Sequence, residues 1–448
     1  MNDRREIFGW SMYDWANSAF STTVLTVFLP VYLSGVIESV EGSGRFLLLG
    51  FIDMTAGGFF PFCVSLSVLM QVFFLPILGA IADYSHLKRR MLLLFATLGS
   101  IATLLLLFVE GSLYALGGAL LILANLSYGA SIVFYNAFLP QMVTKDQRDR
   151  VSSFGWAMGY AGGGLLLLLN LIFLQVVAPA LNISQGDAAR LCIASAGAWW
   201  LVFGFFAISR VRERGAQRAR PPGQSYLGVG FKQLVGTLRE IRKYPMTLRY
   251  LLAYLIYNDG IQTVIIVAAL FGAQELGMEV SELTVVILMV QVVAFIGALL
   301  FGRIARRFGT KQTILGSLVI WSATSIWAQI SLRSKIEFWI LAAVVALVLG
   351  GSQALSRSLF SMMIPREQEA EFFSFYEISD RGTSWIGPAL FTWVQVQTGS
   401  MRTALFSLIV LFVGGLLLLR TVDVRRAIRE SGNDEDRPVE LAPTPALA

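Results

Sequence analysis

The most constraining feature of the sequence is a series of twelve apolar runs, each long enough to cross a lipid bilayer. A transmembrane helix needs about 20 consecutive apolar residues. The runs lie at 7–36, 61–84, 90–109, 113–140, 150–179, 189–209, 247–273, 281–305, 311–331, 336–364, 372–397 and 401–420. Backbone groups inside a bilayer must bond within their own segment, so such runs form helices. The sequence therefore predicts an all-α membrane protein with twelve transmembrane helices.

The composition agrees with a chain that is buried in lipid. Charged residues make up 14% of the sequence and hydrophobic residues 56%, whereas soluble domains carry about 25% charged residues. The net charge of +6 would suit a nucleic-acid partner, but the basic residues lie between the apolar runs, where membrane proteins keep their anchors. We therefore expect the bilayer as a partner, and no nucleic acid.

The sequence offers little for catalysis or metal binding. It contains two cysteines, Cys63 and Cys192, and one histidine, His86. These residues form neither a disulfide framework nor a cluster with metal-ligand spacing. There is also no nucleotide-binding motif. We expect no enzyme activity, no metal, no cofactor and no bound nucleotide.

The distribution of Lys and Arg predicts the orientation. Of the 35 basic residues, 28 fall in one set of connections and 5 in the other, and two lie inside spans. Loops that are rich in Lys and Arg stay on the cytoplasmic side. We therefore expect a multi-pass protein of the cell membrane with both termini in the cytoplasm.

The longest connection divides the spans six and six. We expect an N-terminal bundle at 1–209, a cytoplasmic linker at 210–245, a C-terminal bundle at 246–420 and a disordered cytoplasmic tail at 421–448. Within the linker, apolar residues recur at helical spacing: Phe231, Leu234, Val235, Leu238 and Ile241. This spacing predicts an amphipathic helix on the membrane surface. The alternative is a linker helix in solvent.

The two halves resemble each other. The segment from Gly79 to Lys88 matches the segment from Gly302 to Lys311 at a constant offset of 223 residues. Repeats of this kind predict two six-helix bundles related by a pseudo-two-fold axis along the membrane normal.

The first copy, Gly79-Ala-Ile-Ala-Asp83 leading to Lys88-Arg-Arg90, resembles the loop between spans two and three of the major facilitator superfamily. The resemblance implies that Asp83 takes part in gating, as an acid placed at a neighbouring helix N-terminus. Ordinary membrane anchoring by Lys88 to Arg90 is the alternative. Because the second copy has Arg306 at the Asp83 position, any charge latch belongs to the first half.

Three further segments narrow the resemblance. They are Tyr13-Asp-Trp-Ala-Asn-Ser-Ala-Phe20, Gly350-Gly-Ser-Gln-Ala-Leu-Ser-Arg-Ser358, and Phe372-Phe-Ser-Phe-Tyr-Glu-Ile-Ser-Asp-Arg381 with the following Gly387-Pro388. Together they resemble the vacuolar-effluxer branch of the superfamily, which holds fungal autophagy-related amino-acid effluxers and bacterial relatives. The resemblance implies a transporter, with amino-acid efflux as the narrower expectation.

Polar residues inside the spans mark the candidate site. Asp14, Asn17, Ser18 and Ser21 form one stripe along span one. The residues expected to bind substrate are Tyr13, Asn17, Asn258, Asp259, Gln262 and Gln353. The residues expected to act in coupling or gating are Asp14, Asp83, Asp259, Arg357, Glu377, Asp380 and Arg381. Ionisable groups at this depth normally face water or a partner.

Two of these residues carry specific hypotheses. Asp259 lies near the bilayer midplane, where an ionised carboxyl group is costly, so it is predicted to be the proton- or cation-sensitive group. Asp14 and Arg357 each lie about 10 Å inside the membrane on helices of opposite halves. They are predicted to pair when the cytoplasmic side is closed, with Glu377 as a rival partner for Arg357 and Arg381 for Asp14.

The sequence therefore favours a secondary active transporter that moves a small polar metabolite, with a proton or cation as coupling partner. A membrane sensor or scaffold that kept the transporter fold is the main alternative. An intramembrane enzyme would need a nucleophile and base, or a metal cluster, that the sequence does not supply.

Overall fold

The computed structural model describes residues 1–42, 45–48, 52–83, 87–213, 243–365, 368–381 and 386–433. The first half consists of α1 (Arg4–Ala19), the π-helix η1 (Phe20–Phe28), α2 (Leu29–Glu41), β1 (Arg45–Leu48), β2 (Ile52–Thr55), α3 (Ala56–Asp83), α4 (Lys88–Leu105), η2 (Leu106–Phe108), η3 (Gly111–Leu113), α5 (Tyr114–Met142), α6 (Lys145–Ile172), η4 (Phe173–Val177), α7 (Ala178–Ala180) and α8 (Gln185–Arg210). The second half consists of α10 (Pro245–Leu276), α11 (Val280–Phe308), α12 (Thr310–Ile330), α13 (Lys335–Met362), α14 (Glu369–Arg381), α15 (Ile386–Thr398), α16 (Met401–Ser407), α17 (Ile409–Arg420) and α18 (Val424–Glu430).

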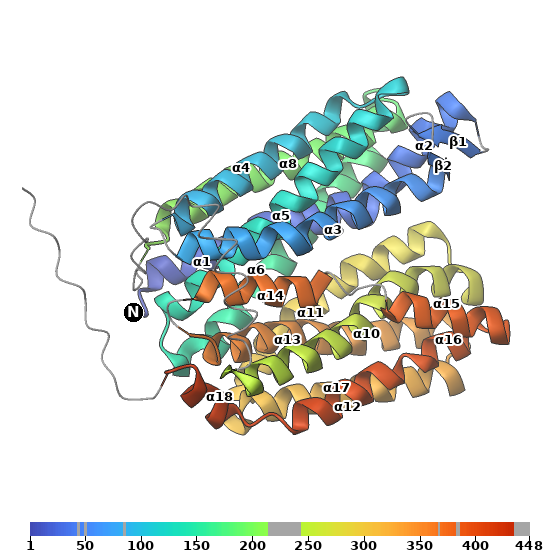
Figure 1. The fold of residues 1–448 in the computed structure, drawn as a ribbon. Coiled ribbons are helices and arrows are strands. Elements are labelled where there is room, and N and C mark those ends of the chain that lie inside the picture. The colour runs from blue at the N-terminus through green and yellow to red at the C-terminus, as the bar shows by residue number, and fades with distance from the viewer. Residues whose placement is uncertain are drawn as a thin grey trace, which may run out of the picture.

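The helices form two groups. Figure 1 shows α1, α3, α4, α5, α6 and α8 together in one group, and α10 to α17 in the other. We call them the N-terminal and C-terminal bundles. The end of the molecule that carries the N-terminus and α18 is named the terminal end, and the end that carries the antiparallel β1–β2 hairpin is named the hairpin end.

Among the described residues, eleven helices are long and apolar enough to cross a membrane. The remaining predicted span, 372–397, is divided into α14 and α15, with residues 382–385 between them outside the described part. The all-α, multi-span prediction is therefore confirmed. The predicted surface helix around 231–241 lies outside the described residues.

Span one runs unbroken from Arg4 to Glu41 but is widened in its middle by η1. Pro30 follows this segment and has no N–H to donate to the turn before it. The Ser21 and Thr26 hydroxyl groups donate to the carbonyl oxygens of Ser18 and Ser21 at 3.1 and 2.9 Å. Missing and competing donors of this kind loosen an α-helical ladder, which accounts for the wider turns.

Close approach of the bundles depends on glycine at matching places of the repeat. A Cβ on Gly79 of α3 would lie 2.6 Å from the Ala370 carbonyl oxygen at the start of α14. A Cβ on Gly302 of α11 would lie 2.6 Å from Ser153 Oγ of α6. These two glycines are related by the offset of 223 residues. Each therefore lets a helix of one bundle touch the other bundle.

The chain after Arg420 differs from the predicted disordered tail. It forms α18, whose N-cap Asp423 accepts a hydrogen bond from the Arg426 amide at 3.0 Å. That backbone hydrogen bond holds the pKa of Asp423 below its usual range. The Asn433 side chain then donates to the Ile364 carbonyl oxygen at 2.6 Å. Capping and this contact order residues 421–433, and residues 434–448 lie outside the described part.

Candidate functional site

The structure contains the predicted pair between Asp14 and Arg357. Arg357 Nη1 of α13 lies 3.0 Å from Asp14 Oδ2 of α1, with the two side chains 4% and 12% exposed. The Tyr135 hydroxyl group of α5 donates to the same Asp14 oxygen at 2.7 Å. A buried charge of either sign is costly without its partner. The pair therefore joins the two bundles by neutralising two charges at once.

The other two guanidinium nitrogens of Arg357 point to α6. Nε donates to Ser152 Oγ at 3.0 Å and Nη2 to the Ser152 carbonyl oxygen at 2.9 Å. The rings of Trp10, Tyr135 and Trp156 surround the guanidinium carbon at centroid distances of 4.9, 5.5 and 5.4 Å. Aromatic faces attract a cation most strongly where water is excluded. This surrounding fixes Arg357 against the N-terminal bundle.

A second ionic group lies closer to the terminal end. Lys88 Nζ contacts Asp83 Oδ1 and Glu369 Oε2, both at 2.8 Å. Gln141 Nε2 also donates to Glu369 Oε2 at 3.3 Å. Asp83 and Lys88 belong to the N-terminal bundle and Glu369 to the C-terminal one, so the contact crosses between bundles. The Arg306 side chain, at the Asp83 position of the repeat, is exposed.

Asp83 also caps a helix of the opposite bundle. Its two carboxylate oxygens accept hydrogen bonds from the amides of Ala370 and Glu371, at 3.2 and 2.9 Å. These amides belong to the first turn of α14, whose unpaired N–H groups favour negative charge. The predicted placement of Asp83 at a neighbouring helix N-terminus is therefore present in the structure.

Two hydrogen bonds between bundles involve neutral side chains. The Tyr160 hydroxyl group of α6 donates to Gln353 Oε1 of α13 at 2.6 Å. Gln291 Nε2 of α11 donates to Thr22 Oγ1 of η1 at 3.1 Å. Neutral pairs of this kind stabilise by only about 1 kcal/mol. They can therefore break and re-form more easily than the ionic contacts.

The predicted residues of span seven contact the divided span eleven. Asn258 Nδ2 donates to Asp380 Oδ1 at 2.9 Å, and the Tyr254 hydroxyl group donates to the same oxygen at 2.6 Å. Asp259 Oδ2 accepts a hydrogen bond from the Gly387 amide, in the first turn of α15. Asp259 Oδ1 has no hydrogen-bond partner among the described residues. Asp259 is thus a second buried carboxyl group at a helix start.

The positions of the other predicted residues do not test their predicted roles. Tyr13 is buried inside the N-terminal bundle, with its ring 5.0 Å from the Tyr135 ring. Asn17 and Glu377 are buried and Gln262 is partly exposed. The Arg381 side chain lies outside the described part. Roles for these five residues stay predictions.

The ion pairs near the hairpin end behave differently. Arg190 pairs with Glu110, Lys335 with Glu282, and Arg402 with Glu275. In the part of the chain that the structure describes, each of these pairs joins helices or loops of one bundle. The two bundles are therefore held together by charge at the terminal end and near Arg357.

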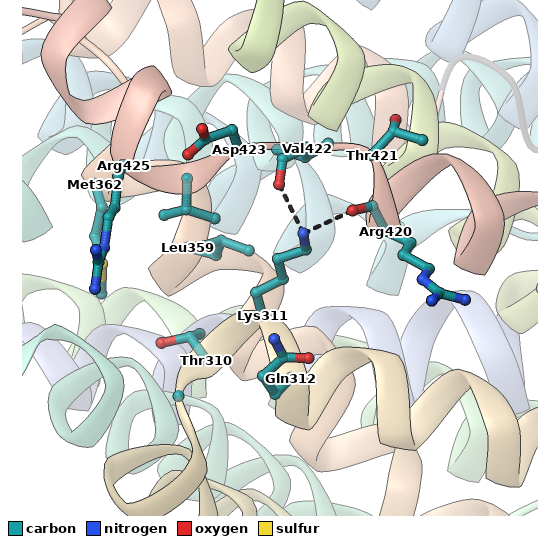
Figure 2. A pocket seen from close by; sticks show the side chains of 12 residues that line it. Thr310, Lys311, Gln312, Leu359, Met362, Arg420, Thr421, Val422, Asp423 and Arg425 are labelled. Atoms are coloured by element: carbon teal, nitrogen blue, oxygen red, sulfur yellow. Dashed lines mark hydrogen bonds between the residues drawn. The ribbon is translucent and has the colours of Figure 1, made fainter.

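One cavity of about 630 Å³ opens at the terminal end (Figure 2). Lys311 extends into it from α12 and donates to the carbonyl oxygens of Arg420 and Val422, at 2.9 and 2.7 Å. Its lining comes from α12, α13, α17, the start of α18 and the loop residues beside them, all in the second half of the chain. Because one bundle alone supplies this lining, the cavity is not a passage between bundles.

Several residues of the interface were not found from the sequence. Tyr135 and Ser152 bind the Asp14–Arg357 pair, and Glu369 completes the Lys88 cluster. Asp149 of α6 accepts a hydrogen bond from Thr310 Oγ1 at 2.6 Å across the bundles. Glu369 and Asp149 share one usable signal, since both are acids near the start of the fifth span of their half.

Comparison with known proteins shows which family the chain is similar to. A family model described as "Vacuole effluxer Atg22 like" matches residues 2–432. The chain is 31% identical to the uncharacterized MFS-type transporter YxiO of Bacillus subtilis (strain 168), over 96% of this chain and 97% of that protein. It is 26% identical to autophagy-related protein 22-1 of Penicillium rubens, over 96% of this chain and 91% of that protein.

Among solved structures, the chain is similar to the human organic anion transporter MFSD10 (TETRAN). The TM-score is 0.70 at 13% identity, covering 94% of this chain and all of that one. An identity this low shows the fold alone, which is that of the major facilitator superfamily. The whole-length family match places the chain more narrowly: it belongs to the Atg22-like vacuole-effluxer family of the major facilitator superfamily.

Proposed function

We propose that this chain is a secondary active transporter that moves a small polar metabolite by alternating access. An amino acid is the first candidate substrate, because the resemblance to autophagy-related effluxers implies it. In this mechanism the two bundles rock about a central site, which opens to either side in turn. Asn17, Gln262 and Gln353 are the proposed substrate contacts, together with Asn258 and Asp259.

The observation that carries the proposal is the uneven distribution of contacts between bundles. Charged contacts join the bundles at the terminal end through Lys88–Glu369 and Asp14–Arg357. Near the hairpin end, the ion pairs among the described residues stay within one bundle. A rocking transporter closed at its terminal end needs this arrangement, because the contacts at one end break as the other end closes.

We propose that the protein lies in the cell membrane with its terminal end on the cytoplasmic side. The 28-to-5 distribution of basic residues supports it. A cysteine at position 224, in a protein without Cys63 and Cys192, should react with an impermeant thiol reagent only after the cells are opened. Labelling of intact cells would overturn the orientation.

Asp259 is the proposed coupling group. It lies 14 residues into α10, about 21 Å along the helix axis, and none of the described Lys or Arg residues forms an ion pair with it. A proton or cation bound here would neutralise the carboxyl group, whose hydrogen-bond donor among the described residues is the Gly387 amide. Binding from one side and release to the other would link the gradient to transport.

Transport in proteoliposomes tests the proposal. Purified protein is assayed with amino acids and other polar metabolites, with and without an imposed pH gradient. Asp259→Asn should abolish gradient-driven accumulation and keep exchange of substrate, while the exposed control Glu38→Gln should behave as wild type. Unchanged accumulation in Asp259→Asn removes Asp259 from the mechanism. If no substrate moves either with or without the pH gradient, a sensor or scaffold replaces the transporter proposal.

A further inference from the structure

The contact between α6 and the second bundle contains a buried acid that the proposed mechanism has not used. Asp149 lies four residues after the start of α6, about 6 Å along its axis. The residue is 8% exposed and is covered by α12 at Thr310 and by α11 at Gly302. Its position is therefore on the terminal-end side of the Asp14–Arg357 pair.

The groups that approach the Asp149 carboxyl group are neutral. Oδ2 accepts from the Thr310 hydroxyl group at 2.6 Å, and the Ser358 hydroxyl group is the other polar neighbour. Oδ1 has no hydrogen-bond partner among the described residues. No described Lys or Arg makes an ion pair with Asp149.

The cations of the neighbouring elements are used elsewhere or point to solvent. Arg357 of α13 binds Asp14, and Lys311 of α12 binds the carbonyl oxygens of Arg420 and Val422. Arg148 of α6 donates to the Ser361 carbonyl oxygen at 2.6 Å. The other cations near these helix ends, Arg150 on α6 and Arg303, Arg306 and Arg307 on α11, are exposed. A charged Asp149 would thus be buried without a counter-ion.

We infer that Asp149 is a further gating residue, whose carboxyl group opposes closure of the terminal end unless it carries a proton. In the closed state it is buried against neutral hydroxyl groups, and separation of the bundles returns it to water. An ionised carboxylate loses hydration on closing without gaining a cation, whereas a protonated one loses much less. The inference rests on the proposed alternating access, since only a moving bundle changes the surroundings of Asp149.

Asp83 has the opposite effect on the same movement. Its charge binds Lys88 and the α14 amides when the terminal end is closed. Neutralising Asp83 should therefore favour the open state, and neutralising Asp149 should favour the closed state. Two acid-to-amide substitutions of equal size, at the same end of the molecule, are expected to act with opposite sign.

The test measures the distance between the bundles at the terminal end without any substrate. Spin labels at the exposed positions Arg90 of α4 and Arg307 of α11, in a protein without Cys63 and Cys192, report the ratio of closed to open molecules. Asp149→Asn should raise this ratio at neutral pH by at least about fivefold, and Asp83→Asn should lower it by a similar factor. Asp149→Glu keeps the charge and should not raise the ratio.

Lowering the pH from about 8 to 5 provides the second measurement. The closed fraction of the wild type should rise more than that of Asp149→Asn. The difference between these two proteins isolates Asp149, because every other ionisable group is the same in both. A thermal unfolding curve checks that each variant is folded.

The outcomes separate this inference from the proposed function. Two distances that interconvert, with the predicted opposite signs, support both. Two distances with Asp149→Asn unchanged, lowered, or matched by Asp149→Glu overturn the role of Asp149 and leave alternating access standing. A single distance in every variant and at every pH overturns both.

Discussion

The two contacts that join the bundles at the terminal end occupy matching places in the repeat but are built differently. On one side, α3 meets α14 through Gly79, and Asp83 binds both Lys88 and the amides of the α14 first turn. On the other, α11 meets α6 through Gly302, and Asp149 meets the Thr310 hydroxyl group. Both contacts use a glycine to bring the bundles close together, but only the first one pairs opposite charges.

This difference suits a repeated fold in which one contact stabilises the closed terminal end and the other makes closure depend on a proton. The first contact gains electrostatic energy on closing, since every charge there finds an opposite charge or a helix dipole. The second contact gains packing but buries a carboxyl group beside neutral partners. In the proposed mechanism, the first contact holds the terminal end closed, and the second requires a proton on Asp149 before the end can close.

The largest expected effect concerns Arg357, which lies deeper than either contact. Arg357→Met leaves Asp14 buried with only the Tyr135 hydroxyl group, and should destabilise the closed protein by about 3–5 kcal/mol. Asp14→Asn combined with Arg357→Met should recover most of this loss. Thermal unfolding of the two single variants and the double variant measures the coupling.

A charge swap at this pair should recover less than the neutral double variant. A carboxylate at position 357 would face the Ser152 carbonyl oxygen and three aromatic rings, which suit a cation. Full recovery of transport by Asp14→Arg with Arg357→Asp would show that charge alone matters. Additive losses in both doubles would show that the two residues act separately.

The two glycines give the next effect. Gly79→Ala places a Cβ against backbone atoms of Ala370, and Gly302→Ala places one against the Ser153 side chain. Each should disfavour the closed state by about 1–3 kcal/mol, with Gly79→Ala the more severe because backbone cannot rotate away. Ser153→Gly should partly rescue Gly302→Ala, and no side-chain truncation at Ala370 should rescue Gly79→Ala. The spin-label distance measures both effects. Equal rescue of Gly79→Ala and Gly302→Ala by side-chain truncation would contradict the difference drawn between the two contacts.

The smallest effect is expected at Thr310. Thr310→Val keeps the shape of the side chain and removes the hydrogen bond to Asp149. The closed state should lose about 1 kcal/mol, so the closed fraction falls where Asp149→Asn raises it. A rise in the closed fraction of Thr310→Val would mean that the hydroxyl group opposes closure.

Much of the fold could be predicted because lipid imposes simple rules on sequence. Apolar runs predicted the long membrane-spanning helices, and the run at 401–420 has the same bounds as the α16–α17 span. The pairing of Asp14 with Arg357 followed from equal depths on helices of opposite halves. Asp83 could be placed at a neighbouring helix N-terminus because its loop resembles that of the major facilitator superfamily. The helix that it caps was not predicted, since the expected span began at residue 372, after Ala370 and Glu371.

The other contacts could not be predicted, because the depth of a residue in the membrane does not determine which side of the helix its side chain faces. Tyr13 is one residue from Asp14, yet about 100° further around the helix, so it packs on Tyr135 inside its own bundle. Glu369 and Asp149 lie in short connections and first turns, where an acid is usually a solvated cap. They are buried because the two bundles close on each other, and contacts between bundles leave no periodic pattern in the sequence.

The ordered segment from α18 to Asn433 has a practical consequence for handling the protein. Asn433 binds the Met362 and Ile364 carbonyl groups of the C-terminal bundle, and its own carbonyl oxygen accepts a hydrogen bond from Lys145 of the N-terminal bundle. A C-terminal truncation or fusion at Arg420, where the last transmembrane helix ends, would remove a bridge between the two halves. Affinity tags and fluorescent reporters should therefore follow Asn433, so that measurements of bundle movement are made on a protein that keeps this bridge.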